Sequence, residues 1–278
     1  MPESVLAAVL GAALLHAGWN AAIKAEPDTL LAAAAITLGA GLLGAIALVF
    51  LPAPAVASWP CLAASSLLQV VYYLLLAATY RDADISHAYP LMRGAAPVLV
   101  TLLNSGNEGL DQAQLAALAL VGAGGAVICV GGGGLRCARR TLVLALLTAL
   151  VIAAYTLVDG LGVRRSGAPA AYTAWLFLLT GIGVSGALAV KRRLGALGAY
   201  LAAKPLLALG GGLATAGSYG VALWAMTLAP IAVVAALRET SIVFAALIAA
   251  SVLRERVGPA RVAGAVLIAG GAVVLRLA

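Results

Sequence analysis

Apolar stretches about as long as a lipid bilayer is thick recur along the 278-residue chain, separated by short polar breaks. About 20 helical residues, at 1.5 Å per residue, cross a hydrocarbon core about 30 Å thick. Lipid offers the backbone no hydrogen-bond partner, and no segment alternates like a barrel strand, so each stretch is predicted to be a helix. We expect ten such spans, at residues 4–23, 29–51, 60–80, 86–104, 112–134, 141–163, 169–190, 204–228, 230–253 and 259–277.

The composition supports an all-α integral membrane protein. Apolar residues make up 64% of the chain and charged residues 10%, whereas soluble domains have about 45–50% and about 25%. The net charge of +7 comes without any basic cluster interleaved with aromatics, so no nucleic-acid partner is expected. The three cysteines lack the spacing of a metal site, and neither a metal nor a cofactor is expected.

Lys and Arg are distributed unevenly between alternate loops. Counting the loops after odd-numbered spans gives twelve, namely Lys24, Arg81, Arg136, Arg139, Arg140, Lys191, Arg192, Arg193, Lys204, Arg254, Arg256 and Arg261. The opposite side carries three, namely Arg164, Arg165 and Arg276. Cytoplasmic loops are enriched in Lys and Arg, so both termini are predicted to lie on the side opposite the cytoplasm. The chain is expected to be a multi-pass protein of a bacterial inner membrane.

The two halves of the sequence resemble each other. The stretch AYPLMRGAAPVLVTLL at 88–103 aligns with VVAALRETSIVFAALI at 233–248, so that Arg93 falls on Arg238. GAGGAV at 122–127 aligns with IAGGAV at 268–273 at nearly the same offset. Five spans per half is an odd number, so the second half must enter the membrane inverted. We therefore expect a first repeat at 1–135 and a second, inverted repeat at 136–278.

These features resemble the EamA family of the drug/metabolite transporter superfamily. The likeness rests on ten spans in two repeats, on Glu108 and Glu255 before the glycine-rich stretches QLAALALVGAGGAVICVGG and ARVAGAVLIAGGAVVL, and on the opening LLHAGWNAAIK. It implies a basket of ten helices around a central cavity lined by helices 1, 3, 4, 6, 8 and 9. Helices 5 and 10 would lie at the periphery, where members self-associate, so a monomer or homodimer is expected. Many members keep both termini in the cytoplasm, which the Lys and Arg count contradicts here.

Two arginines, Arg93 and Arg238, are predicted to lie deep within spans. An arginine at a span centre costs about 2.5–3.5 kcal/mol even on insertion scales, so such residues usually face a wet cavity or a partner. A pair of cations near the midplane could hold the carboxylate of a solute. The alternative is a salt bridge that joins helices, from Arg238 to Glu239 or to Asp159.

Other polar and aromatic residues share single helix faces. His16, Trp19 and Asn20 follow i, i+3, i+4 spacing, which is typical of a cavity lining, although hydrogen bonds between packed helices would also explain it. Asp159, four residues after Tyr155, is a candidate proton relay, or else an ion-pair partner of Arg164 or Arg165. The predicted substrate-binding residues are His16, Trp19, Asn20, Gln69, Tyr73, Tyr89, Arg93, Tyr155, Asp159, Tyr219, Trp224, Arg238 and Glu239.

This mixture of cations, acids and rings predicts a transporter that exports small metabolites, above all amino acids with apolar or aromatic side chains, by alternating access between the two repeats. An exporter of cationic compounds is the alternative within this class, although two arginines disfavour a cation. An enzyme is not expected, because the sequence contains no HExxH or GxSxG motif. A structural or receptor-like membrane protein would not need buried charge in both halves.

Overall fold

The computed structural model describes residues 2–82, 85–131, 139–251 and 258–277, with side chains for all of these except 82–91, 94, 105–108 and 249–251. Almost all of this part is α-helix, and the all-helical membrane fold predicted from the sequence is confirmed. The helices are α1 (Glu3–Lys24), α2 (Thr29–Leu48), α3 (Trp59–Asp82), α4 (Ile85–Glu108), α5 (Gln112–Gly131), α6 (Arg139–Ser166), α7 (Pro169–Val190), α8 (Leu194–Ala203), α9 (Pro205–Met226), α10 (Ile231–Arg238), α11 (Thr240–Ser251) and α12 (Pro259–Leu277), with a 3-10 turn at Val56–Ser58.

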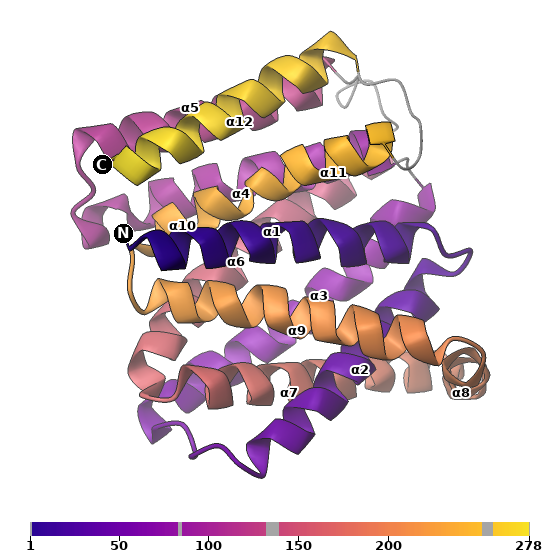
Figure 1. Ribbon diagram of the computed structural model, residues 1–278. Helices are drawn as coiled ribbons and strands as arrows, with labels where there is room; N and C mark the ends of the chain where they lie inside the picture. Colours follow the sequence, from indigo (N-terminus) through magenta and orange to yellow (C-terminus); the bar gives the residue numbers. More distant parts are fainter. Residues whose placement is uncertain (1, 83–84, 132–138, 252–257, 278) are drawn as a thin grey trace.

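The predicted spans match these helices closely, with two differences. Nine segments of the described chain are long and apolar enough to cross a membrane, and α4 contains a shorter apolar stretch, Ala95–Asn104. The short helix α8 was not predicted; its ten residues are apolar but too few to span a membrane. The predicted span 230–253 is divided at Glu239 into α10 and α11. Both chain termini lie at the same end of the bundle (Figure 1).

Small residues bring the helix backbones close together. A Cβ added to Gly124 of α5 would lie 2.7 Å from the carbonyl oxygen of Gly264 in α12, and one added to Gly44 of α2 would lie 2.6 Å from that of Ala174 in α7. The α5–α12 pair runs along one edge of the molecule (Figure 1). Close packing of small side chains replaces the hydrophobic driving force that helices lack in lipid.

Helix contacts recur in matched pairs. Helix α1 packs against α9 and α3 packs against α6, while α4 contacts α6 and α11 contacts α1. Helices α2 and α7 contact each other, as do α5 and α12. If each span of the first half corresponds to the span five places later, the α1–α9 contact corresponds to the α3–α6 contact, and α4–α6 corresponds to α1–α11. The α2–α7 and α5–α12 contacts each correspond to themselves.

The break between α10 and α11 exposes polar backbone inside the bundle. At Glu239 the hydrogen bonds tighten from the α-helical to the 3-10 pattern, since its N–H donates to Ala236 O at 3.0 Å and its carbonyl accepts from Ile242 N–H at 2.9 Å. The hydroxyl of Thr240 donates to Leu237 O at 2.7 Å. Interrupted helices of this kind mark solute sites in many membrane transporters, because freed backbone groups face a protein interior rather than lipid.

Candidate functional site

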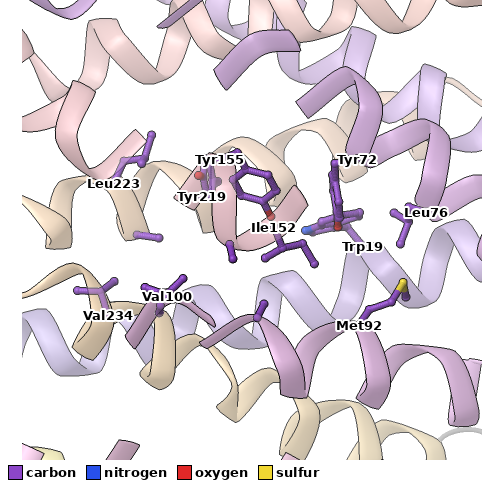
Figure 2. Close-up of a cluster of buried hydrophobic side chains, with 14 of the residues drawn as sticks. Trp19, Tyr72, Leu76, Met92, Val100, Ile152, Tyr155, Tyr219, Leu223 and Val234 are labelled. Carbon is purple, nitrogen blue, oxygen red and sulfur yellow. The ribbon is translucent and has the colours of Figure 1, made fainter. Parts of the chain in front are cut away.

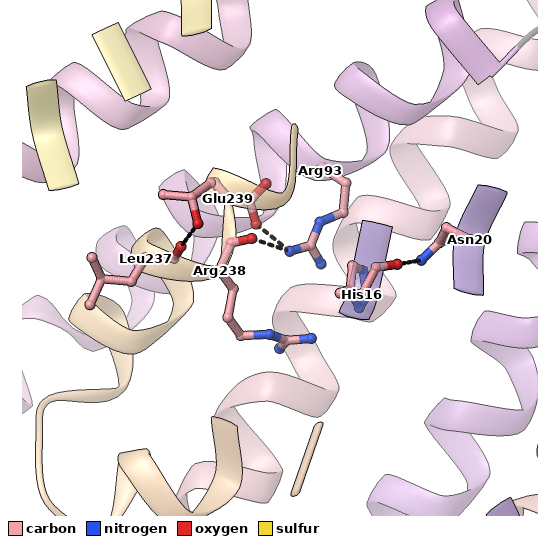
Figure 3. A network of polar contacts seen from close by, with 7 residues as sticks. His16, Asn20, Arg93, Leu237, Arg238 and Glu239 are labelled. Atoms are coloured by element: carbon pink, nitrogen blue, oxygen red, sulfur yellow. Dashed lines mark hydrogen bonds and ion pairs between the residues drawn. The ribbon is translucent and has the colours of Figure 1, made fainter. Parts of the chain in front are cut away.

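The two matched arginines meet at the break between α10 and α11. Arg93 of α4 lies with its Nη2 atom 2.7 Å from Oε1 of Glu239, and both side chains are 3% exposed. The same Nη2 also points at the carbonyl oxygen of Arg238, at 3.5 Å. This ion pair ties the fourth span to the ninth (Figure 3). The alternative pairing of Glu239 with its neighbour Arg238 is wrong, because the carboxylate faces α4 instead.

Arg238 points away from that ion pair. Its guanidinium carbon lies 4.9 Å from the ring centre of Tyr219 on α9, a cation–π distance. The side chain is buried, and it has no ion pair with any residue in the described part of the chain. Figure 3 shows it extending in the opposite direction from Glu239. A buried guanidinium without an anion is costly, and its charge is available to an anionic group of a ligand.

Aromatic rings from four helices surround Arg238. Tyr72 and Tyr73 of α3 lie 5.0 Å apart, and Tyr72 lies 5.5 Å from Tyr155 of α6. Tyr155 in turn lies 5.8 Å from Tyr219 of α9, and Trp19 of α1 lies 6.0 Å from Tyr73. Figure 2 shows the rings of Trp19, Tyr72, Tyr155 and Tyr219, which come from separate helices. They give the centre of the bundle an apolar and π-rich wall.

Between these rings lies a small cavity, which we call the arginine cavity. Its volume is about 10 Å³, close to the minimum for one water molecule. As far as the described residues go, the arginine cavity is therefore closed to any solute larger than about one water molecule. The lining residues are His16, Trp19, Gln69, Tyr72, Tyr73, Tyr155, Phe177, Thr215, Ser218, Tyr219 and Arg238.

Four polar atoms of the residues lining this cavity have no hydrogen-bond partner among the described residues, namely His16 Nε2, Trp19 Nε1, Gln69 Nε2 and Thr215 Oγ1. The first two are fully buried, and the rings of His16 and Trp19 stand edge to face at 5.0 Å. A buried polar atom without a partner costs about 1–3 kcal/mol, so proteins rarely retain one unless it has a use. The indole nitrogen can only donate a hydrogen bond, and it faces the same space as the Arg238 cation.

Asp159 is fully buried beside the arginine cavity but does not line it. Its two carboxylate oxygens accept hydrogen bonds from Tyr172 at 2.9 Å and from Tyr219 at 2.6 Å. The predicted alternative, an ion pair with Arg164 or Arg165, is wrong. Arg164 instead donates to the carbonyl oxygens of Met226 and Ala229 at the end of α9. Tyr219 thus links Asp159 on one side to Arg238 on the other.

The remaining predicted residues have different surroundings. Asn20 is used in packing, since its amide donates to His16 O at 2.9 Å and accepts from the hydroxyl of Tyr80 at 3.1 Å. Gln69 lines the cavity close to Asp159. Trp224 is 40% exposed and lines a different, outer groove. The side chain of Tyr89 lies outside the described residues, as do those of Glu108 and Glu255.

Several lining residues were not predicted. Thr215 and Ser218 precede Tyr219 with i, i+3, i+4 spacing on α9, and this pattern of small polar residues could have found them. Phe177 of α7 carries no such signal, and neither does Tyr172, which contacts Asp159 beside the cavity, because one aromatic residue in an apolar helix is ordinarily packing. Their positions depend on which helices are neighbours.

The loops at the end of the bundle opposite the termini are joined by charged contacts. Lys204 pairs with Glu26, which also accepts a hydrogen bond from the Tyr200 hydroxyl at 2.8 Å. The hydrogen bond from Lys204 lowers the pKa of Glu26, against a smaller opposing effect of burial and with help from Tyr200. Arg193 pairs with Asp28, whose carboxylate also caps α2 by accepting from Leu31 N–H at 3.0 Å.

Comparison with known proteins identifies a family for the second half of the chain. Residues 139–277 match the model of the EamA-like transporter family. No curated protein matches the chain. A solved structure described as "Crystal structure of protein" is 19% identical, covers 100% of this chain and 98% of its own, and superposes with a TM-score of 0.71. At this identity the likeness concerns the fold alone.

Proposed function

Because this chain belongs to the EamA-like transporter family, it is a multi-pass membrane transporter, and we propose that it exports amino acids with apolar or aromatic side chains. The single observation that carries this proposal is the Arg238 guanidinium, buried in the bundle, stacked on Tyr219 and without an anion among the described residues. A solute carboxylate would give this cation the partner that it lacks.

The rest of the arginine cavity suits the other parts of such a solute. The rings of Trp19, Tyr73 and Tyr155 offer an apolar wall, and edge-to-face contacts between aromatic groups contribute about 0.5–1.5 kcal/mol each beyond burial. Trp19 Nε1 and His16 Nε2 offer one donor and one further polar atom for the head group.

Cationic compounds are the second candidate in this class, and the geometry disfavours them. Of the described residues lining the arginine cavity, none is acidic. Glu239 is engaged by Arg93, and Asp159 by two tyrosine hydroxyls. A cation would thus meet an uncompensated positive charge, and like charges in a medium of low dielectric constant repel strongly.

We further propose that transport proceeds by alternating access between two inverted repeats, 1–135 and 136–278. The matched helix contacts described above support a two-fold relation, and the Arg93–Glu239 pair joins the corresponding fourth and ninth spans. Rocking of one repeat against the other would open the closed arginine cavity to each side in turn. The Lys and Arg count places both termini outside the cytoplasm in this proposal.

A liposome experiment tests the proposed function. Purified protein is reconstituted, and uptake of labelled alanine, phenylalanine, tryptophan and a matched amine, phenethylamine, is measured with and without a pH gradient. We expect the amino acids to move and the amine to be excluded, and we expect Arg238→Gln to abolish amino-acid movement. The proposal fails if no amino acid moves, and the cationic alternative gains if only the amine does.

A further inference from the structure

A large apolar groove lies on the outer side of α9, behind the arginine cavity. We call it the α2–α7–α9 groove, and its volume is about 530 Å³. The exposed side chains of Leu213 and Trp224 are part of its lining. The groove is lined by Ala40, Leu43, Gly44, Ala47, Leu51, Pro169, Ala170, Thr173, Ala174, Phe177, Leu213, Ala216, Gly220 and Trp224. Most of these side chains are small, so the hollow exists because bulk is missing there.

Phe177 is the residue common to the linings of the groove and of the arginine cavity, as far as the described residues go. It is 2% exposed, and its ring stands edge to face against Tyr219 at 6.2 Å. Helix α9 separates the two spaces elsewhere, with Thr215 and Tyr219 toward the cavity and Ala216 and Gly220 toward the groove. One aromatic ring therefore stands between a charged pocket and an apolar one.

The sizes of the two spaces are unequal in a way that matters for binding. The volume of the arginine cavity is about 10 Å³, which is room for about one water molecule and too little for an amino-acid side chain. The groove, at about 530 Å³, falls within the range of about 300–1,000 Å³ that ligand pockets occupy. An adjoining space of sufficient size lies behind Phe177, so a solute whose charged group reaches Arg238 between the rings could extend the remainder of its apolar part into that space.

We propose that the α2–α7–α9 groove receives the apolar body of the transported solute, with Phe177 as the movable wall and Arg238 as the anchor for its anionic head. This inference rests on the proposed function and extends it to a substrate class, namely amphipathic carboxylates with a bulky apolar part. A turn of the Phe177 side chain would join the two spaces without moving a helix.

The protein contains a matched control for this idea. A second apolar groove of about 400 Å³ lies between α4, α5 and α6, with Ala126 among its lining residues. None of its described lining residues also lines the arginine cavity. A lipid chain could fill either groove, whereas a solute held by Arg238 could use only the one next to Phe177.

The experiment fills each groove and compares a large with a small solute. Uptake of phenylalanine and of alanine is measured side by side in proteoliposomes for wild type, Ala216→Phe and Ala126→Phe. We expect Ala216→Phe to lower the phenylalanine-to-alanine rate ratio about tenfold or more, since lost space in an apolar pocket changes discrimination by about 10–200-fold. Ala126→Phe should leave the ratio unchanged.

Other outcomes overturn the proposal in distinguishable ways. If wild type moves neither solute, the proposed function itself fails and the groove assignment with it. If both solutes move but Ala216→Phe preserves their ratio, or lowers both rates equally, the groove is structural or filled by lipid and the assignment is wrong. If Ala216→Phe does not fold, Phe177→Leu decides, because a smaller wall should raise the tryptophan-to-alanine ratio severalfold, and an unchanged ratio contradicts the proposal.

Discussion

Arg93 and Arg238 align with each other when the two halves of the sequence are compared, yet their surroundings in the structure differ completely. Arg93 is held by Glu239 at 2.7 Å, whereas Arg238 rests on the Tyr219 ring and has no anion within the described structure. The residue after Arg238 is Glu239, but the residue after Arg93 is a glycine. Glu239 thus pairs with the arginine of the first half and leaves its own neighbour, Arg238, without an ion pair among the described residues.

This asymmetry suggests a division of labour between the two arginines. A paired charge buried in a helix seam fixes the relative position of the fourth and ninth spans. An unpaired charge at a cavity is destabilising in the empty protein and useful when a ligand arrives. The following variants should separate these roles.

The largest expected effect is the loss of stability on replacing Arg93. Arg93→Ala leaves the Glu239 carboxylate buried without its partner, and breaking a buried ion pair in this way costs about 3–5 kcal/mol. Unfolding in detergent, followed by circular dichroism, measures the change. A free energy of unfolding equal to that of wild type would mean that this pair is not structural.

A double variant controls for the loss of bulk. In Arg93→Met with Glu239→Leu, both charges are replaced by apolar side chains of similar length, and such exchanges are often neutral or stabilising. We expect most of the lost stability to return. If it does not, the Arg93 side chain contributes packing rather than charge pairing.

Arg238→Gln should behave in the opposite way. It should weaken amino-acid binding at least about 30-fold, because truncating a buried charge that pairs with a ligand costs about 2–5 kcal/mol. Its stability should stay within about 1 kcal/mol of wild type, since only the contact with Tyr219 is lost. Tryptophan-fluorescence titration gives the first quantity and detergent unfolding the second. A large stability loss with intact binding would reverse the roles assigned to the two arginines.

The Asp159 carboxylate is held by tyrosine hydroxyls rather than by a cation, and replacing it tests how much these hydrogen bonds stabilise the fold. Both of its carboxylate oxygens accept from tyrosine hydroxyls, and an amide has only one oxygen to offer. Asp159→Asn should therefore lower stability by about 1–3 kcal/mol, less than Arg93→Ala. Detergent unfolding of both variants under one condition decides the order, and an equal or greater loss in Asp159→Asn would contradict it.

The smallest expected effect on stability concerns the ion pair of Glu26 and Lys204 near the surface. Glu26→Gln should cost no more than about 0.2–1 kcal/mol, the range for surface ion pairs. Because Lys204 lowers the pKa of Glu26 in the folded protein, the stabilisation is present above the ordinary pKa of 4.5 and is lost as the pH falls through the lowered value. Melting curves of wild type and variant should converge at acidic pH, and a difference that grows there would contradict this assignment.

Much of the fold can be predicted from the sequence, because span length and hydrophobicity are local properties. The correspondence of Arg93 with Arg238 is visible in the same way, from an internal alignment. The partner of each charge is not, because a helical period shows which face a residue lies on but not which helix faces it. From the sequence, a pairing of Glu239 with its neighbour Arg238 was one alternative, whereas Glu239 pairs with Arg93, 146 residues away in the sequence.

The break at Glu239 and the position of Phe177 were missed for a related reason. The segment 231–248 is apolar apart from Arg238, Glu239, Thr240 and Ser241, and it has no proline or glycine that would predict a break. At the interruption, Arg93 donates to the carbonyl oxygen of Arg238 from another helix, and the Thr240 hydroxyl donates to the carbonyl oxygen of Leu237. The sequence of α7 does not distinguish Phe177 from a packing residue. Its position between the arginine cavity and the α2–α7–α9 groove follows from the packing of α7 against other helices.

The most direct test of the account is a cycle between Arg238 and the carboxylate of the solute. Binding of phenylalanine and of its decarboxylated counterpart, phenethylamine, is measured by titration calorimetry for wild type, Arg238→Gln and the double variant of Arg93 and Glu239. The account predicts that wild type and the double variant prefer phenylalanine by at least about tenfold, whereas Arg238→Gln does not discriminate. A preference that survives in Arg238→Gln and vanishes in the double variant would contradict it.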